Sequence, residues 1–100
     1  MANGKSTVGA ERAAWRASVV EDVLWPNQRI CDAHHHLWDH TGDRYFAAEL
    51  AADIGDGHNV RQTVYVECGS AYRTSGPAEL APVGETEFVV RQEAELAQLV

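Results

Sequence analysis

The chain has 100 residues, of which 45% are apolar, and this composition is typical of one small globular domain. Fifteen acidic residues outweigh eight basic ones, which gives a formal net charge of −7, and lysine and arginine form no cluster. These features argue against binding to nucleic acid or to an anionic membrane surface, because both need a basic patch.

Neither a secretory signal nor a membrane span is predicted. Residues 1–10 are small and polar and lack the apolar core of about 7–15 residues that a signal peptide needs. No apolar run approaches the roughly 20 residues of a transmembrane helix. Cys31 and Cys68 lie far apart and are expected to be reduced thiols. The sequence therefore favours a soluble, cytoplasmic protein.

The first part of the chain predicts a flexible lead and a docking helix. Residues 1–10 are interpreted as the lead. From residue 11 to 24, apolar side chains recur at three- and four-residue steps with charged side chains between them, and Pro26 stops this pattern. We expect residues 11–28 to form an amphipathic helix and a turn that dock on a partner surface.

Two buried strands separated by a helix are expected next. Residues 29–37 are a short apolar run that follows a Pro-Asn turn, which suits a strand. A turn at Thr41-Gly42-Asp43 is followed by helical spacing over residues 44–54, with Asp43 as the cap. Residues 62–68 are rich in β-branched and aromatic side chains and predict the second strand.

The last part of the chain predicts a long loop over residues 69–84 and a helix from Glu85 onward. Acidic residues at this helix start, Glu85 and Glu87, are favourably placed in the helix dipole, and Glu85 is also a candidate to face the pocket. Strands that alternate with helices indicate an α/β fold with a parallel sheet. Two parallel strands cannot close a sheet, so we expect residues 29–100 to be part of a larger structure.

Three consecutive histidines at residues 34–36 carry the clearest chemical signal. On a strand Asp32, His34 and His36 share one face, while His35 lies on the other and is expected to be packed. Imidazoles at i and i+2 stand about 6–7 Å apart along the strand, and side-chain rotation lets both nitrogens reach one cation. Asp32 would accept an imidazole N–H or support the strand end. A surface loop that scavenges metal is the alternative interpretation.

Several segments together resemble one enzyme family. The stretch I-C-D-A-H-H-H-L-W-D resembles the opening strand of the amidohydrolase superfamily, in its branch of predicted metal-dependent hydrolases that includes sugar-lactone and pyrone-dicarboxylate lactonases. The segments R-Y-F-A-A-E-L and G-H-N-V-R-Q-T-V-Y-V-E-C-G are similar to the first helix and second strand of that branch. The segment P-V-G-E-T-E-F-V resembles its next helix start. The resemblance covers about residues 25–90.

The resemblance implies a TIM-barrel, or (β/α)8, hydrolase. Residues 29–100 would be its first two βα units behind the N-terminal helix, and the rest of a barrel of about 250 residues would come from sequence beyond residue 100. It also implies that His34 and His36 bind a divalent metal, usually zinc, which activates water for attack on an ester or amide carbonyl. Some lactonase relatives work without metal, and there the histidines bind or polarise the substrate.

Hydrolysis of a cyclic ester, a lactone, is therefore the expected activity, on a small-molecule substrate. One alternative on the same fold is decarboxylation of an aromatic or dienoic acid. Alternatives of another class are a non-catalytic metal-binding module and an inactive fragment of a longer protein.

Glu67, Tyr72 and Arg73 are the secondary candidates. Glu67 follows the second strand and shares a face with Thr63 and Tyr65. It is a candidate catalytic carboxylate if that face points into the barrel, and a solvated or salt-bridged side chain if it does not. Tyr72 and Arg73 lie in the next loop, in the class of loops that builds barrel active sites. We predict that they bind substrate, with Arg73 gripping a carboxylate, although an exposed loop arginine is the alternative.

Overall fold

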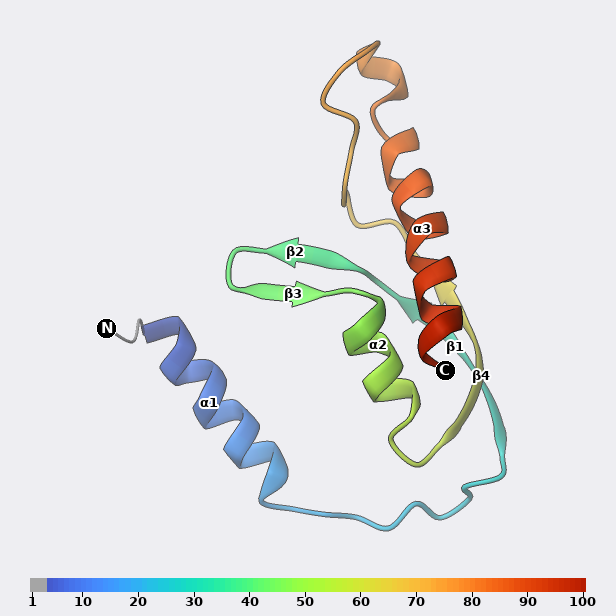
Figure 1. Cartoon of the computed structure of the whole chain (residues 1–100). Coiled ribbons are helices and arrows are strands. Elements are labelled where there is room, and N and C mark those ends of the chain that lie inside the picture. The colour runs from blue at the N-terminus through green and yellow to red at the C-terminus, as the bar shows by residue number, and fades with distance from the viewer. Residues whose placement is uncertain (1–3) are drawn as a thin grey trace.

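The computed structural model describes residues 4–100 and has a mixed α/β architecture (Figure 1). In chain order its elements are α1 (Gly4–Ala17), β1 (Arg29–His35), β2 (Trp38–His40), β3 (Asp43–Tyr45), α2 (Ala47–Ile54), β4 (Asn59–Tyr65), the 3-10 helix η1 (Ala78–Leu80) and α3 (Val83–Leu99). The strands form two separate two-stranded sheets, and residues 4–100 contain no closed barrel. None of the helices in this range is long and apolar enough to cross a membrane.

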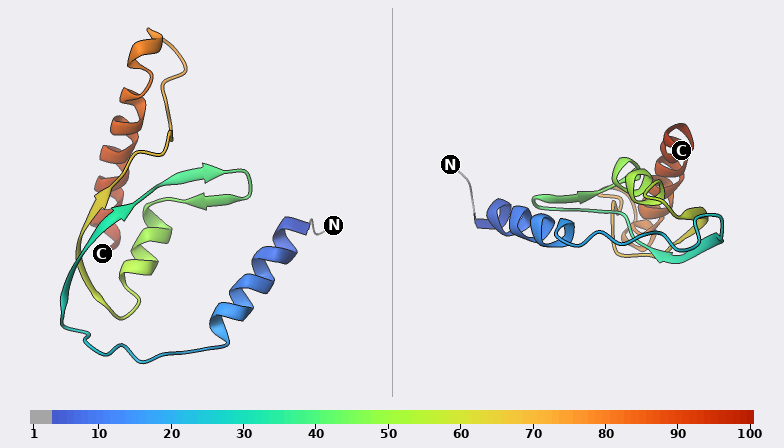
Figure 2. Two further views of the ribbon diagram at one scale, coloured as in Figure 1. Left: turned by 180° about the vertical axis from the view of Figure 1, so that it is seen from behind. Right: turned by 90° about the horizontal axis from the view of Figure 1, so that it is seen from below.

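Helix α1 stands apart from the other elements, and an extended segment joins it to β1 (Figures 1 and 2). The predicted flexible lead is wrong for residues 4–10, which are helical, while residues 1–3 lie outside the described part of the chain. Good helix formers at residues 10–14 explain the helix. Because α1 lies apart from the other elements, the radius of gyration is 16.5 Å, compared with about 13 Å for a compact domain of this length.

The helix predicted over residues 11–24 ends early, at Ala17. The hydroxyl of Ser18 donates a hydrogen bond to the carbonyl of Trp15 at 2.5 Å, directly after the last turn. Val19 and Val20 come next, and β-branched residues lower helix propensity. Trp15 is 76% exposed, so the apolar side of α1 gains little from burial, and burial is what normally extends an amphipathic helix.

Strands β1 and β4 pair in parallel, as the alternation of strands and helices predicts. The second strand lies three residues earlier than predicted, at residues 59–65, because the pairing begins with Arg29 opposite Asn59. The Asn59 side chain supports this register by donating to the carbonyl of Asn27 at 3.2 Å. Each strand of the pair has one neighbour within residues 4–100.

A hairpin of β2 and β3 replaces the first turn of the predicted helix over residues 44–54, so Asp43 is not its cap. The loop between the two strands is Thr41-Gly42, and Gly42 has a φ of 76°, where glycine meets no steric penalty. Asp39 lies opposite Arg44, and such opposite charges stabilise an antiparallel pair. Helix α2 therefore begins only at Ala47.

Helices α2 and α3 pack together on one side of the parallel strands (Figure 2). Leu37, Leu50 and Phe88 form the buried core between these elements. Helix α3 begins at Val83, two residues before the predicted start, and follows η1, which interrupts the predicted loop over residues 69–84. Leu37 directly follows the three histidines, so this small core lies beside the end of β1 that carries them.

Candidate functional site

The imidazoles of His34 and His36 converge at the end of β1. Their Nε2 atoms are 3.1 Å apart, and the ring centroids are separated by 4.8 Å at an interplanar angle of 81°. The pairing register shifts between Asp32 and His35, so β1 is irregular where the pair begins. The structure thus brings together the two side chains that the i, i+2 spacing on a strand predicts to be neighbours.

A backbone carbonyl orients the His36 ring. Nδ1 of His36 lies 2.8 Å from the carbonyl oxygen of Val66, in the segment after β4. Because a carbonyl oxygen can only accept, Nδ1 must be the protonated nitrogen that donates. In the neutral ring Nε2 then carries the lone pair, and it points toward His34.

This arrangement fits a divalent metal such as zinc. Two nitrogens bound to one ion at about 2.0–2.1 Å and at a tetrahedral angle would be about 3.3–3.4 Å apart. The observed 3.1 Å between the two Nε2 atoms is close to that spacing. Metal-binding histidines also usually donate their other N–H to a carbonyl or carboxylate, as His36 does to Val66. Within the described residues, however, no group of three or more His, Cys, Asp or Glu side chains is assembled for a metal.

Asp32 supports the strand end and does not contact an imidazole. Its Oδ1 accepts a hydrogen bond from the backbone N–H of His34 at 3.1 Å. Of the two roles predicted for this carboxylate, the structure shows support of the strand end. The bond fixes the backbone at the irregular part of β1, and His34 projects from that position.

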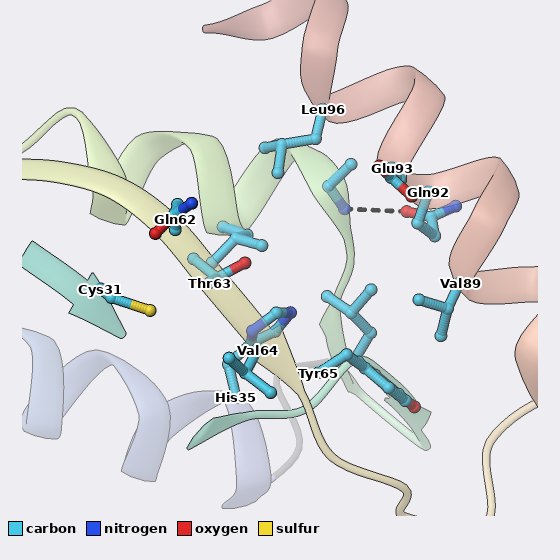
Figure 3. A pocket seen from close by; sticks show the side chains of 13 residues that line it. Cys31, His35, Gln62, Thr63, Val64, Tyr65, Val89, Gln92, Glu93 and Leu96 are labelled. Carbon is cyan, nitrogen blue, oxygen red and sulfur yellow. Dashed lines mark hydrogen bonds between the residues drawn. The ribbon is translucent and has the colours of Figure 1, made fainter. Parts of the chain in front are cut away.

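His35 lies on the side of β1 that faces the helices, as expected for the histidine between the pair. It packs edge-on against Tyr65, with ring centroids 5.6 Å apart. Both residues line a cavity of about 570 Å³ between the parallel strands and α2 and α3 (Figure 3). Burial lowers the pKa of His35 below its usual 6.5, although the nearby carboxylate of Asp32 opposes the shift. A packed role therefore fits His35 better than metal binding.

Glu67 is exposed and lies in a different hollow from the histidine pair. It lines a depression with Tyr65, Glu85 and residues of α3, and no hydrogen bond links it to the pair. The face that it was predicted to share with Thr63 and Tyr65 is turned toward the helices, because both of these residues line the cavity against α2 and α3. A catalytic role for Glu67 stays a prediction.

Tyr72 and Arg73 also lie away from the histidines. Both are exposed, and Nε of Arg73 donates to Oε1 of Glu87 at 2.7 Å. The loop lies against the start of α3, since a Cβ on Gly84 would be 2.5 Å from backbone atoms of Ala71 and Arg73. The structure thus gives Arg73 an intramolecular carboxylate partner, and substrate binding by Tyr72 and Arg73 stays a prediction.

Glu85 makes several hydrogen bonds near the site, and the sequence does not predict these bonds. Its Oε2 accepts hydrogen bonds from the Tyr65 hydroxyl at 2.6 Å, from the Cys68 N–H at 2.9 Å and from the Ser70 N–H at 3.2 Å. Burial raises the pKa of Glu85, but these hydrogen bonds outweigh burial and hold the pKa below its usual 4.5. The sequence shows only an acidic residue in the first turn of a helix, which usually indicates an effect of the helix dipole.

Aromatic stacking continues from the histidine pair into the hairpin. The ring of Trp38 stacks on His36 at 6.0 Å and on His40 at 5.2 Å, measured between ring centroids. Trp38 therefore links the ring of His36 to the hairpin of β2 and β3.

Comparison of the chain with protein-family models, with curated proteins and with solved structures gave no match in any of the three.

Proposed function

We propose that His34 and His36 bind a divalent cation, with zinc as the first choice, in a hydrolase of the amidohydrolase type that opens a lactone. The observation that carries this proposal is the convergence of the two Nε2 atoms at 3.1 Å, with Nδ1 of His36 held by the Val66 carbonyl. The resemblance of residues 25–90 to the lactonase branch supplies the reaction and the barrel, of which β1 and β4 would be the first two strands.

In this proposal His36, His34 and Asp32 each have a separate role in the metal site. Nε2 of His36 presents its lone pair because Nδ1 is used by Val66. Nε2 of His34 completes a two-nitrogen site, and Asp32 holds the backbone from which His34 projects. A bound divalent cation would supply acidified water near neutral pH and polarise the carbonyl of the substrate. Further ligands and the catalytic acid–base group would have to come from other strands.

A non-catalytic metal-binding role is the second candidate. It is favoured by one observation, that residues 4–100 assemble no third side-chain ligand beside the histidines. An ion held by two imidazoles would bind weakly and would have no residue beside it to transfer protons. Decarboxylation on the same fold uses the same histidines and differs in its product, carbon dioxide.

Calorimetric titration of zinc into the full chain tests the site. We expect binding that is lost or weakened at least tenfold in His34→Ala and in His36→Ala. His58→Ala is the matched control, because His58 is exposed and lies away from the pair. Equal zinc affinity in wild type and His36→Ala would refute the site.

Assays of sugar lactones and pyrones, with product analysis, then separate the activities. Ring opening that is lost in His34→Ala supports the hydrolase, and release of carbon dioxide supports the decarboxylase. Zinc binding that depends on the two histidines, without turnover of either substrate class, supports the non-catalytic role.

A further inference from the structure

The structure assigns Glu85 as the positioning residue for His36, which it holds indirectly through the segment 66–70. This inference rests on the proposed function, since the orientation of His36 matters for binding a ligand between the two histidines. Glu85 touches neither imidazole, so its effect must pass through the backbone.

The first link joins Val66 to the end of β1. The N–H of Val66 donates to the carbonyl of His35 at 2.8 Å, and the carbonyl of Val66 accepts from Nδ1 of His36 at 2.8 Å. One peptide unit after β4 therefore fixes both the strand end and the imidazole ring. Any displacement of Val66 moves the acceptor that selects the His36 tautomer.

The second link consists of the hydrogen bonds that join Glu85 to the segment after Val66. A single carboxylate oxygen accepts the N–H groups of Cys68 and Ser70 and the hydroxyl of Tyr65, the last residue of β4. Glu85 is only 5% exposed, so water cannot readily replace these bonds. Hydrogen bonds to an ionised acceptor are about twice as strong as neutral ones. The charge of Glu85 is thus what shapes the segment.

The third link joins Ser70, in this segment, to Leu37, the residue after His36. The hydroxyl of Ser70 donates to the carbonyl of Leu37 at 2.6 Å, and Leu37 is buried in the core. His36 is consequently held from two directions, at its ring by Val66 and through the backbone by Ser70. Glu85 accepts the backbone N–H of Ser70, the residue whose hydroxyl makes the contact with Leu37.

The test reads the His36 tautomer by nitrogen–proton correlation NMR of the full chain without metal, at a pH where the imidazoles are neutral. We expect the Nδ1–H form in wild type and a shift toward Nε2–H in Glu85→Gln, which keeps the shape of the side chain but removes its charge. Glu87→Gln is the matched control: it lies on the same helix and pairs with Arg73 at the surface, so it should leave the tautomer unchanged.

Zinc titration of the same variants gives the second readout. The affinity is expected to fall about 10–100-fold in Glu85→Gln, the usual effect of losing a residue that orients a metal ligand. Glu87→Gln should bind zinc like wild type.

Ser70→Ala keeps the inference testable if Glu85→Gln does not fold, because it removes the contact with Leu37 and leaves the carboxylate in place. It should shift the tautomer in the same direction. The inference is overturned if the variant that folds has the same Nδ1–H fraction as wild type. It is also overturned if His36 of wild type does not populate the Nδ1–H tautomer. If wild type binds no zinc but the tautomer still shifts in Glu85→Gln, the proposed function fails and the positioning role stands.

Discussion

The Oε1 atom of Gln92 accepts the backbone N–H of Ala47 at 2.9 Å, so a side chain from α3 caps the start of α2. Phe46, the residue just before α2, provides no side-chain cap for this helix. Both partners are buried, and a buried N–H without an acceptor is costly. The two helices are thus joined by a polar contact as well as by their apolar core.

Loss of this cap should destabilise the chain. Gln92→Ala is expected to lower the free energy of unfolding by about 1–3 kcal/mol, the cost of a buried unsatisfied N–H. Urea denaturation followed by circular dichroism measures the change. Gln98→Ala, an exposed position on the same helix, should change the value by less than about 0.5 kcal/mol. Equal effects of the two substitutions would contradict a capping role for Gln92.

Gly84 allows the loop after β4 to lie against α3. In Gly84→Ala the new Cβ would be 2.5 Å from the carbonyl oxygen of Ala71 and from the N atom of Arg73, and neither is a flexible side-chain end. We expect a loss of about 1–3 kcal/mol in the free energy of unfolding, typical of overpacking. Gly9→Ala is the control, since its Cβ would meet no atom within 4 Å. A thermal midpoint that stays at the wild-type value in Gly84→Ala would disprove this close contact.

Glu85 should make stability depend on acidic pH. Its pKa in the folded chain is below the usual 4.5, so its contribution is present above that pH and is lost as the pH falls through the folded value. The difference in the free energy of unfolding between wild type and Glu85→Gln should therefore shrink between about pH 5 and pH 3. Denaturation at a series of pH values measures it. A difference that stays constant over this range would show that the pKa of Glu85 is the same in the folded and the unfolded chain.

Tyr65 should make the free energy of unfolding fall as the pH rises above about 10. Burial and its hydrogen bonds to Cys68 and Glu85 raise the pKa of Tyr65 well above the usual 10.0. Above pH 10 the unfolded chain can release the phenolic proton while the folded chain retains it, so stability is lost as the pH rises. Tyr65→Phe should lose less stability than wild type between pH 9 and pH 11. Superimposable curves for the two proteins would contradict the raised pKa.

The part of the site that the sequence predicts depends on local geometry. Strand spacing places His34 and His36 side by side, and β-branched residues near Val64 indicate a strand, so the pair and the parallel sheet follow from short segments. The three-residue displacement of β4 could not be predicted, because the register depends on contacts between distant segments such as Asn27 and Asn59.

The parts that were missed depend on tertiary contacts. The helix predicted over residues 11–24 ends at Ala17 because its apolar side has no surface to pack against. The hairpin could not be predicted because Asp43 after a Thr-Gly turn is typical of a helix cap, and its strand pairing with His40 is visible only in the structure. The hydrogen bonds of Glu85 could not be predicted, because the amides of Cys68 and Ser70 come near it only in the folded chain.

The parallel pairing of β1 and β4 has a consequence for behaviour in solution. On its outer side each strand offers a row of backbone donors and acceptors at fixed spacing, and no further strand within residues 4–100 uses it. Such a row is a template for any extended segment that approaches it. We therefore expect the chain to self-associate through these strand edges, so that its assembly state changes with concentration.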